Sequence, residues 1–348
     1  MREASSLFVN EDSKAIEAIK TINKTEAYIA LVVDKEQKLL GTITDGDIRR
    51  GLLKGHTPES NIKKFMNTNF KAIYEEEIEE SDLTKFFDDD IKHIPLIDKF
   101  GHVKDILKRE EIVGNNKEII NTAVIMAGGK GTRLRPHTTN CPKPMLKIKG
   151  KPMLEIILNK CINSGFSRFY FSVNYLKEQI IDYFEDGSKW GVNINYLIER
   201  KALGTAGALN LVPQSLKDPL LVLNGDVITD LDLNSLVNFH QEYSAAITVA
   251  AKYEENLVPY GVIHTSGLDL LKIVEKPTQK ILVSAGVYVI NPEIIKFIDL
   301  DEHFDMPNLI NIAIENNFKV LTFPIYEYWQ DVGRPENLKI VSKEIESN

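Results

Sequence analysis

The stretch Thr122–Met145, which reads TAVIMAGGKGTRLRPHTTNCPKPM, decides the fold of the larger part of this chain. Its first six residues fit a short buried strand, and the glycines that follow let the backbone approach a ligand closely. In α/β sheets, ligands bind beyond the carboxyl ends of such strands. The residues of this loop that suit a phosphate are Gly128, Gly129, Gly131, Arg133, Arg135 and Lys143.

Two common phosphate-binding motifs do not fit this loop. A P-loop requires G-x-x-x-x-G-K-[ST], whereas Lys130 is followed by Gly131. A dinucleotide fingerprint requires a small residue where Leu134 stands, and the loop is too long before the next helix. The loop therefore predicts a phosphate site of another kind.

Strands and helices alternate after this loop. We expect helices over Pro152–Ser164, Lys177–Glu185 and Asn234–Tyr243, and strands in FYFSVNY, VNINYLI and PLLVLNGD. This alternation predicts an α/β fold with a mixed, mostly parallel sheet and helices on both faces.

The front part of the chain contains a weak repeat with a period of about 64 residues. Each copy reads as a helix (Ser13–Ile22; Ser81–Phe87), an apolar strand, a turn, a second strand and a closing helix. One copy is too small to bury a core alone, so we expect the two to pack together. A short polar connector, Val113–Asn121, joins this part to the rest.

From Thr122 onward the sequence resembles the sugar-1-phosphate nucleotidyltransferases, whose signature is G-G-x-G-T-R-L-x-P-x-T-x-x-x-P-K-P. The resemblance covers about residues 121–340 and includes LNGD, PYGV, VEKP and YWQDVG in the same order. It implies a Rossmann-like nucleotidyltransferase domain, which we place at residues 121–343.

The resemblance also implies roles for individual residues. The implied catalytic residues are Arg133, Lys143, Asp226 and Asp331. Of these, Arg133 and Lys143 would bind the reacting phosphates, and Asp226 and Asp331 would hold Mg²⁺. The implied nucleotide-binding residues are Ala127, Gly128, Gly129, Gly131, Thr132, Glu199, Gly204 and Thr205. The implied sugar phosphate residues are Gly261, Glu275, Lys276 and Ser284, the last standing where many relatives have asparagine.

These residue types suit nucleotidyl transfer on chemical grounds. Both reactants are anions, so catalysis depends mainly on positioning and on neutralising charge. Mg²⁺ prefers one or two carboxylates together with substrate phosphates and water. A sugar phosphate is already a nucleophile, so no general base is required.

The stretch Glu199–Leu209, which reads ERKALGTAGAL, resembles the base pocket of the GTP-using branch and is expected to open a helix. Glu199 is a candidate acceptor for the guanine N–H groups, or else a surface charge. The domain order and these motifs resemble the glucosamine-1-phosphate guanylyltransferases of bacterial legionaminic acid biosynthesis. Mannose- or heptose-1-phosphate guanylyltransferase activity stays open, as does a catalytically inert nucleotide-sensing subunit.

The front part resembles a tandem CBS-domain pair, which we place at residues 1–118. In GTITDGDI, Thr44 and Asp47 match the family residues that hold an adenosine nucleotide (AMP, ADP or ATP). The same two residues also suit a helix cap. In the second copy Lys108 and Glu111 stand at these positions, so we expect at most one ordinary nucleotide site per chain. The resemblance also implies a homodimer or a higher homo-oligomer.

Composition excludes several other classes of protein. With 42 basic and 50 acidic residues the net charge is −8, which argues against a broad nucleic-acid-binding face. No apolar run approaches the ~18 residues of a membrane span, and the N-terminus lacks the apolar core of a secretory signal. Only two cysteines occur, Cys141 and Cys161, so we expect a cytoplasmic protein without a disulfide framework.

Overall fold

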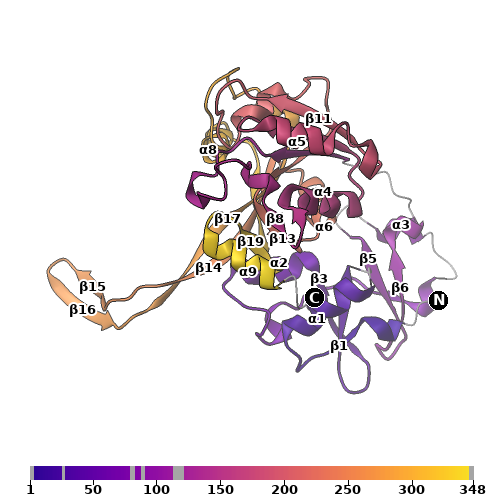
Figure 1. Cartoon of the computed structure of the whole chain (residues 1–348). Coiled ribbons are helices and arrows are strands. Elements are labelled where there is room, and N and C mark those ends of the chain that lie inside the picture. Colours follow the sequence, from indigo (N-terminus) through magenta and orange to yellow (C-terminus); the bar gives the residue numbers. More distant parts are fainter. Residues whose placement is uncertain (1–3, 26–27, 79–82, 88–90, 113–120, 345–348) are drawn as a thin grey trace. The chain divides into compact units, whose positions relative to one another are not determined.

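The structure is a computed structural model that describes residues 4–25, 28–78, 83–87, 91–112 and 121–344. The chain divides into two compact units, Met1–Glu118 and Ile119–Asn348 (Figure 1). Except for Asn121, the predicted connector lies outside the described residues. Among the helices in the described ranges, none is long and apolar enough to cross a membrane.

The first unit contains two three-stranded sheets, ordered β1-β2-β3 and β4-β5-β6. The elements of its first copy are η1 Ala4–Leu7, β1 Phe8–Asn10, α1 Ala15–Thr25, β2 Ile29–Val33, β3 Leu39–Thr44, α2 Asp45–Leu53 and η2 Ile62–Lys64. Those of its second copy are β4 Ile73–Tyr74, η3 Glu75–Glu77, η4 Leu83–Phe86, β5 His93–Ile97, β6 Val103–Lys108 and α3 Arg109–Ile112.

The two sheets repeat each other residue for residue at an offset of 64. In each, the first strand runs parallel to the second, and the second runs antiparallel to the third. Ile29 lies opposite Thr44, and His93 lies opposite Lys108. Both sheets even break register at the same place, after Val32 and after Leu96. The predicted repeat is therefore present in the backbone.

The two copies share a hydrophobic core, as the small size of each predicts. Leu31 and Leu39 of the first copy pack in one cluster with Ile97 of the second. The Leu39 N–H donates to the Gly101 carbonyl oxygen at 2.9 Å, which also joins the copies through the backbone. The helix predicted over Ser81–Phe87 is wrong in type, because its described part is a 3-10 helix.

The second unit is built on a seven-stranded sheet of order β11-β10-β7-β12-β17-β14-β18. Its elements up to the middle of the unit are β7 Thr122–Met126, η5 Thr132–Leu134, η6 Lys143–Met145, β8 Lys147–Ile148, β9 Lys151–Pro152, α4 Met153–Asn163, β10 Arg168–Val173, α5 Lys177–Phe184, η7 Ser188–Trp190, β11 Asn193–Ile198, η8 Gly207–Leu211, β12 Leu220–Asn224, β13 Val227–Thr229 and α6 Leu233–Glu242. The remainder are β14 Ile247–Leu257, β15 Val262–Ser266, β16 Asp269–Val274, β17 Thr278–Ile290, α7 Pro292–Ile295, α8 Met306–Glu315, β18 Val320–Ile325, β19 Trp329–Asp331 and α9 Pro335–Glu344.

The mixed sheet predicted from the alternating pattern is confirmed. Within the sheet only β17 runs against its neighbours, since β12 and β14 pair with it antiparallel while the other adjacent pairs are parallel. Alternate residues of β7 face two separate cores: Ala123 and Ile125 pack with α4, α5 and α6, and Val124 packs with α7 and α8. Helices therefore cover both faces of the sheet.

Helix α4 illustrates how local sequence sets these elements. Its apolar residues recur on one face, where Leu154, Ile157 and Leu158 are buried. The helix ends where Gly165 adopts a φ of +89°, a conformation that glycine accepts without strain. The Phe166 N–H then donates to the Cys161 carbonyl at 3.1 Å and closes the last turn. The predicted helix Pro152–Ser164 agrees with α4 to within one residue at each end.

Candidate active site

The Gly-rich loop leaves the carboxyl end of β7 between two neighbouring strands. The Ala127 N–H donates to the Ser172 carbonyl of β10 at 2.9 Å, and the Gly225 N–H donates to the Met126 carbonyl, also at 2.9 Å. A Cβ at Gly225 would lie 2.7 Å from that carbonyl oxygen, so only glycine allows the backbone at position 225 to approach Met126 this closely. The loop and the LNGD turn therefore meet at one edge of the sheet, where α/β proteins bind ligands.

A second pair of strands brings Asp226 and Asp331 together at this edge. Strand β13 pairs antiparallel with β19, which sets Val227 opposite Asp331. The Val332 N–H donates to the Asp226 carbonyl at 2.9 Å and extends the pairing by one step. Two residues that are 105 positions apart in the sequence thus lie on neighbouring hydrogen-bonded segments, close enough for the charge of Asp226 to act on the Asp331 carboxyl.

The two carboxylates differ in their cationic and hydrogen-bond partners. The Lys143 ammonium donates to an Asp226 oxygen, so Asp226 has a cationic partner. Burial, followed by the nearby Asp226 charge, raises the pKa of Asp331, while Lys143, Arg133 and Arg334 act to lower it. The buried Oδ1 atom of Asp331 has no hydrogen-bond partner in the described part of the chain. A buried carboxylate oxygen without a partner is costly unless something binds it.

This pair of carboxylates fits a Mg²⁺ ion. Magnesium takes oxygen ligands and is held in proteins by one or two carboxylates, with substrate phosphates and water completing the shell. The unpartnered Oδ1 of Asp331 and the adjacent Asp226 carboxylate provide that donor set. Within the described ranges no group of three or more His, Cys, Asp or Glu side chains could enclose a metal alone, so further ligands would have to come from the substrate.

The glycines of the loop serve different purposes. Gly131 has a φ of +58°, and a Cβ there would lie 2.9 Å from Lys143 Cβ and 3.0 Å from Thr138 Cγ2. The Thr138 hydroxyl donates to the Gly131 carbonyl at 2.8 Å, which fixes the loop against Lys143. A Cβ at Gly129, by contrast, would meet no atom within 4 Å. Close packing therefore explains why position 131 is glycine. At Gly129 no neighbouring atom excludes a side chain, so the space beside it is open to a ligand.

Glu199 is buried directly behind the loop. Its carboxylate accepts hydrogen bonds from the Ser172 hydroxyl and from the Leu203 N–H, the latter at 2.9 Å. A Cβ at Gly128 would lie 2.3 Å from Glu199 Oε1, so the loop rests on this carboxylate. The interpretation of Glu199 as a surface charge is therefore wrong, since its side chain is 6% exposed.

The stretch after Glu199 was expected to open a helix and forms only the 3-10 helix η8. Gly204 has a φ of +81°, which interrupts helical geometry before that point. Thr205 donates its N–H to Asp305 Oδ1 at 3.0 Å, and its hydroxyl accepts from the Met306 N–H at 2.8 Å. Gly204 and Thr205 thus anchor this segment to the start of α8, and their role toward a nucleotide stays a prediction.

The residues predicted for the sugar phosphate separate into two places. Ser284 lies in β17 beside the sheet edge, where its hydroxyl and the Tyr288 hydroxyl are 2.8 Å apart. Gly261, Glu275 and Lys276 lie instead on the long hairpin that carries β15 and β16 away from the sheet (Figure 1). There the Lys276 N–H donates to the Tyr260 carbonyl at 3.2 Å. These three residues therefore flank β15 and β16 and do not lie in the seven-stranded sheet.

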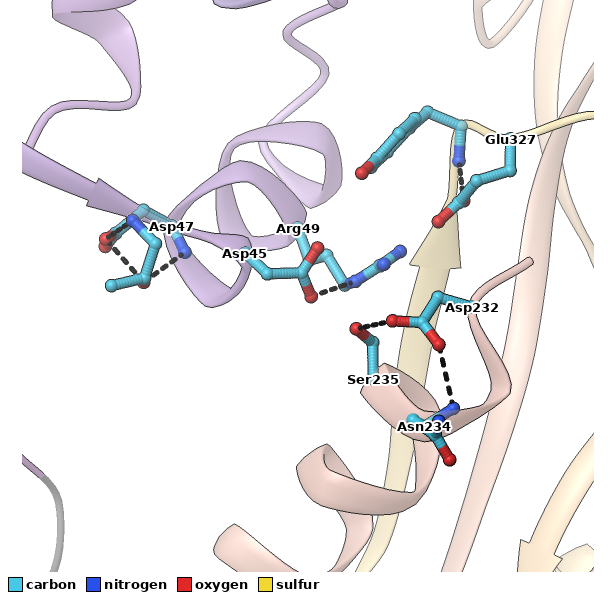
Figure 2. Close-up of polar contacts among 9 residues, drawn as sticks. Asp45, Asp47, Arg49, Asp232, Asn234, Ser235 and Glu327 are labelled. Atoms are coloured by element: carbon cyan, nitrogen blue, oxygen red, sulfur yellow. Dashed lines mark hydrogen bonds and ion pairs between the residues drawn. The ribbon is translucent and has the colours of Figure 1, made fainter. Parts of the chain in front are cut away.

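In the first unit, Thr44 and Asp47 form a capping box at the start of α2. Asp47 Oδ2 accepts from the Thr44 N–H at 2.8 Å and from the Thr44 hydroxyl at 2.7 Å (Figure 2). Asp47 Oδ1 accepts from Arg50 Nη2 at 2.6 Å. The helix-cap interpretation of both residues is therefore confirmed. Their adenosine nucleotide role stays a prediction.

Sequence reasoning missed several residues that shape the site. Ser172 holds Glu199, and Asn224 lies so close to Gly286 that a Cβ there would be 2.6 Å from its Nδ2 atom. Arg334 follows Asp331 by three positions, and its positive charge acts to lower the pKa of Asp331. The basic residue just after YWQDVG was a usable signal, whereas the Ser172 contact depends on how β10 and β11 pair.

Comparison with known proteins agrees with this architecture. A family model described as nucleotidyl transferase matches residues 122–348, and the CBS domain model matches residues 3–54. The chain is similar to the mannose-1-phosphate guanyltransferase of Yarrowia lipolytica, at 35% identity over 62% of this chain and 61% of that protein. It is also similar to the UTP–glucose-1-phosphate uridylyltransferase of Synechocystis sp., at 34% identity over 61% of this chain and 60% of that protein.

The matched region spans about three fifths of the length of these relatives. Among solved structures, HddC from Yersinia pseudotuberculosis has the same fold, with a TM-score of 0.53 and 24% identity over 65% of this chain and 100% of that chain. Since the nucleotidyl transferase match covers well over half of the residues, the chain belongs to the nucleotidyl transferase family and carries a CBS domain ahead of that unit.

Proposed function

We propose that the second unit transfers a nucleotidyl group from a nucleoside triphosphate to a sugar 1-phosphate. A sugar phosphate oxygen forms the new bond to the α-phosphorus, the bond from that phosphorus to the β-phosphate oxygen breaks, and pyrophosphate leaves. The observation that supports this best is the pair of carboxylates Asp226 and Asp331, held side by side next to Lys143 at the carboxyl edge of the sheet. Family membership supports it independently.

Each residue of this cluster has a physical task in such a reaction. Arg133 and Lys143 neutralise the triphosphate, and the loop around Gly129 lets its backbone approach closely. Asp226 and Asp331 would hold Mg²⁺, which when bound supplies further positive charge to the phosphates. Positioning of two anions in line accounts for most of the rate, and no residue has to take a proton.

We further propose GTP as the nucleotide and glucosamine 1-phosphate as the sugar. GTP is supported by GTAGAL after Glu199 and by relatives named as guanyltransferases, although one relative is named as a uridylyltransferase. The sugar is supported by the order of the domains and by Glu275, whose carboxylate next to Lys276 suits a substrate with both an amine and a phosphate.

The test is pyrophosphate release from a grid of four triphosphates and the 1-phosphates of glucosamine, N-acetylglucosamine, mannose, heptose and glucose, with Mg²⁺. We expect one dominant signal at GTP with glucosamine 1-phosphate. A signal with GTP and mannose or heptose 1-phosphate would retain the base and overturn the sugar. No signal in any cell would favour the inert nucleotide-sensing subunit.

A Glu275→Gln variant sharpens the assignment of the sugar. Because it keeps the shape of the side chain and removes its charge, we expect it to lose preference for glucosamine over glucose 1-phosphate by about tenfold. An unchanged preference would show that Glu275 does not recognise the amine.

For the first unit we propose control by an adenosine nucleotide at Thr44 and Asp47. The match of the CBS model to residues 3–54 supports this. Calorimetric titration of AMP, ADP and ATP would compare the wild type with Asp47→Ala and with Glu111→Ala, the matched position of the second copy. Binding that only Asp47→Ala abolishes is expected, and no binding to the wild type would leave Thr44 and Asp47 as a helix cap alone.

A further inference from the structure

A short segment carries the chain from the seven-stranded sheet to Asp331. Strand β18, at the edge of that sheet, ends at Ile325, and β19, which pairs with β13, begins at Trp329. We call the residues between them, 326–328, the crossover. Because Asp331 is the last residue of β19, the course of the crossover determines where its carboxyl reaches the edge of the sheet.

The side chain of Lys252 holds the start of the crossover. Lys252 lies in β14 opposite Ile325, at the end of the parallel pairing of β14 with β18. Its Nζ atom donates to the Glu327 carbonyl at 2.7 Å and to the Tyr326 carbonyl at 3.2 Å. Hydrogen bonds from a charged donor are roughly twice as strong as those between neutral groups. Lys252 therefore fixes the direction in which the chain leaves β18.

The far end of the crossover is fixed by the neighbouring strands. The Tyr328 carbonyl accepts from the Thr229 hydroxyl at 2.7 Å and from the Asp230 N–H at 3.0 Å. Trp329 Nε1 donates to the Ala285 carbonyl at 2.7 Å, at the place where the pairing of β17 with β14 breaks register. Each carbonyl of the crossover thus accepts from a donor on another strand or turn, and the crossover is held at both ends.

Lys252 is half-buried, which is costly for an ammonium group. Burial lowers the pKa of Lys252, while the charges of Glu327 and Glu254 act to raise it. Ala250, two positions earlier in β14, packs in the same core as α6, so strand alternation directs Lys252 to that face. A methionine would fill such a position without this cost. The two carbonyl contacts are therefore what a lysine adds here.

We propose that Lys252 is a positioning residue that sets the Asp331 carboxyl for Mg²⁺. The inference rests on the proposed function, in which Asp331 and Asp226 hold the metal. Lys252 acts through the crossover, because the buried Oδ1 atom of Asp331 has no hydrogen-bond partner among the described residues and takes its place from the backbone. Removing a group that orients a metal ligand from behind typically lowers metal affinity by about 10- to 100-fold.

Binding of Mn²⁺ tests this role without relying on turnover. Mn²⁺ suits the same carboxylate and water ligands as Mg²⁺, and its EPR spectrum reports the free ion. Lys252→Met keeps the length of the side chain and removes its donors, so we expect its Mn²⁺ affinity to fall about tenfold. The matched control is Lys319→Met, because Lys319 Nζ also donates to a main-chain carbonyl, that of Tyr243, at 2.5 Å, next to the opposite end of β18. The control should bind Mn²⁺ like the wild type.

A second variant separates the loss of the hydrogen bonds from a loss of folding. Lys252→Arg restores a charged donor, so it should bind Mn²⁺ more tightly than Lys252→Met. We also expect excess Mg²⁺ to restore the pyrophosphate release of Lys252→Met, which it would not do for an unfolded protein. An Arg variant that binds no more tightly than the Met variant would overturn the role of the hydrogen bonds.

The remaining outcomes distinguish this inference from the proposed function. Equal Mn²⁺ affinities of Lys252→Met and the wild type, or an equal loss in Lys319→Met, would overturn the positioning role of Lys252. A wild type that binds Mn²⁺ and releases no pyrophosphate would refute the proposed function alone. A wild type that does not bind Mn²⁺ would refute the metal assignment of Asp331, and the role of Lys252 with it.

Discussion

The sheet edge and the projecting ribbon of residues 253–283, which we call the arm, carry motif residues of one proposed reaction in opposite surroundings. At the edge, Asp226 and Asp331 are fixed by the pairing of β13 with β19, and Lys143 is already paired with Asp226. On the arm, Glu275 and Lys276 are exposed on a ribbon without a core. The edge therefore holds its charged groups in fixed contacts, whereas the arm holds its charged pair on an exposed ribbon. The predictions below test this contrast.

The largest effect is expected at the edge. Because Asp226 lies at the reacting phosphates in the proposed reaction, Asp226→Ala should lower turnover by about 10²- to 10³-fold. The matched control is Asp232→Ala in the same unit, where the carboxylate caps α6 by accepting from the Asn234 N–H and the Ser235 hydroxyl (Figure 2). That variant should keep its turnover and lose about 1 kcal/mol of stability. Equal activities of the two variants would contradict the role of Asp226.

A smaller effect is expected on the arm. In the proposed reaction Lys276 donates a charge-assisted hydrogen bond to the sugar phosphate, so Lys276→Ala should lower kcat/KM for that substrate about 10- to 100-fold and leave the KM for GTP unchanged. Lys272→Ala, on the same arm, is the control, and steady-state kinetics of both variants is the measurement. An equal fall of kcat/KM in the two variants would mean that the total positive charge of the arm, and not a contact of Lys276, affects the sugar phosphate.

Substitutions at two glycines of the loop should affect folding and ligand binding separately. Gly131→Ala should destabilise the protein by about 1–2 kcal/mol, because its positive φ and its contact with Lys143 exclude a side chain. Gly129→Ala should change stability by less than about 0.5 kcal/mol and still weaken nucleotide binding. Denaturant unfolding and nucleotide titration measure the two effects. Normal nucleotide binding by Gly129→Ala would remove the loop from the proposed site.

The smallest effect concerns the charge of Asp331. Since the folded state raises its pKa, the ionised form opposes folding above the ordinary carboxyl range, and this penalty disappears as the pH falls below that range. Asp331→Asn should therefore melt a few degrees higher than the wild type at pH 7 without metal, and the difference should vanish at acidic pH. Added Mg²⁺ should stabilise the wild type and not the variant. Thermal melts with and without Mg²⁺ are the measurement. A variant that melts below the wild type at pH 7 without metal, or that Mg²⁺ stabilises as much as the wild type, would contradict this prediction.

Much of the sheet edge could be predicted from sequence, since its residues occur in short motifs that follow buried strands. The alternation of strands and helices predicted the sheet, and the 64-residue repeat predicted two copies that share a core. The burial of Glu199 could not be predicted in this way, because it depends on the pairing of β10 with β11 and on the approach of Gly128. The projection of Lys276 could not either, because motif order contains no information on how far β14 and β17 extend together.

The most direct test of the account is phosphorus NMR of the intact chain mixed with GTP, glucosamine 1-phosphate and Mg²⁺. The account predicts that the GTP signals are replaced by those of a nucleoside diphosphate sugar and pyrophosphate in equal amounts, and that omission of the sugar phosphate prevents the change. Unchanged GTP, or its conversion to GMP or GDP whether or not the sugar phosphate is present, would contradict it.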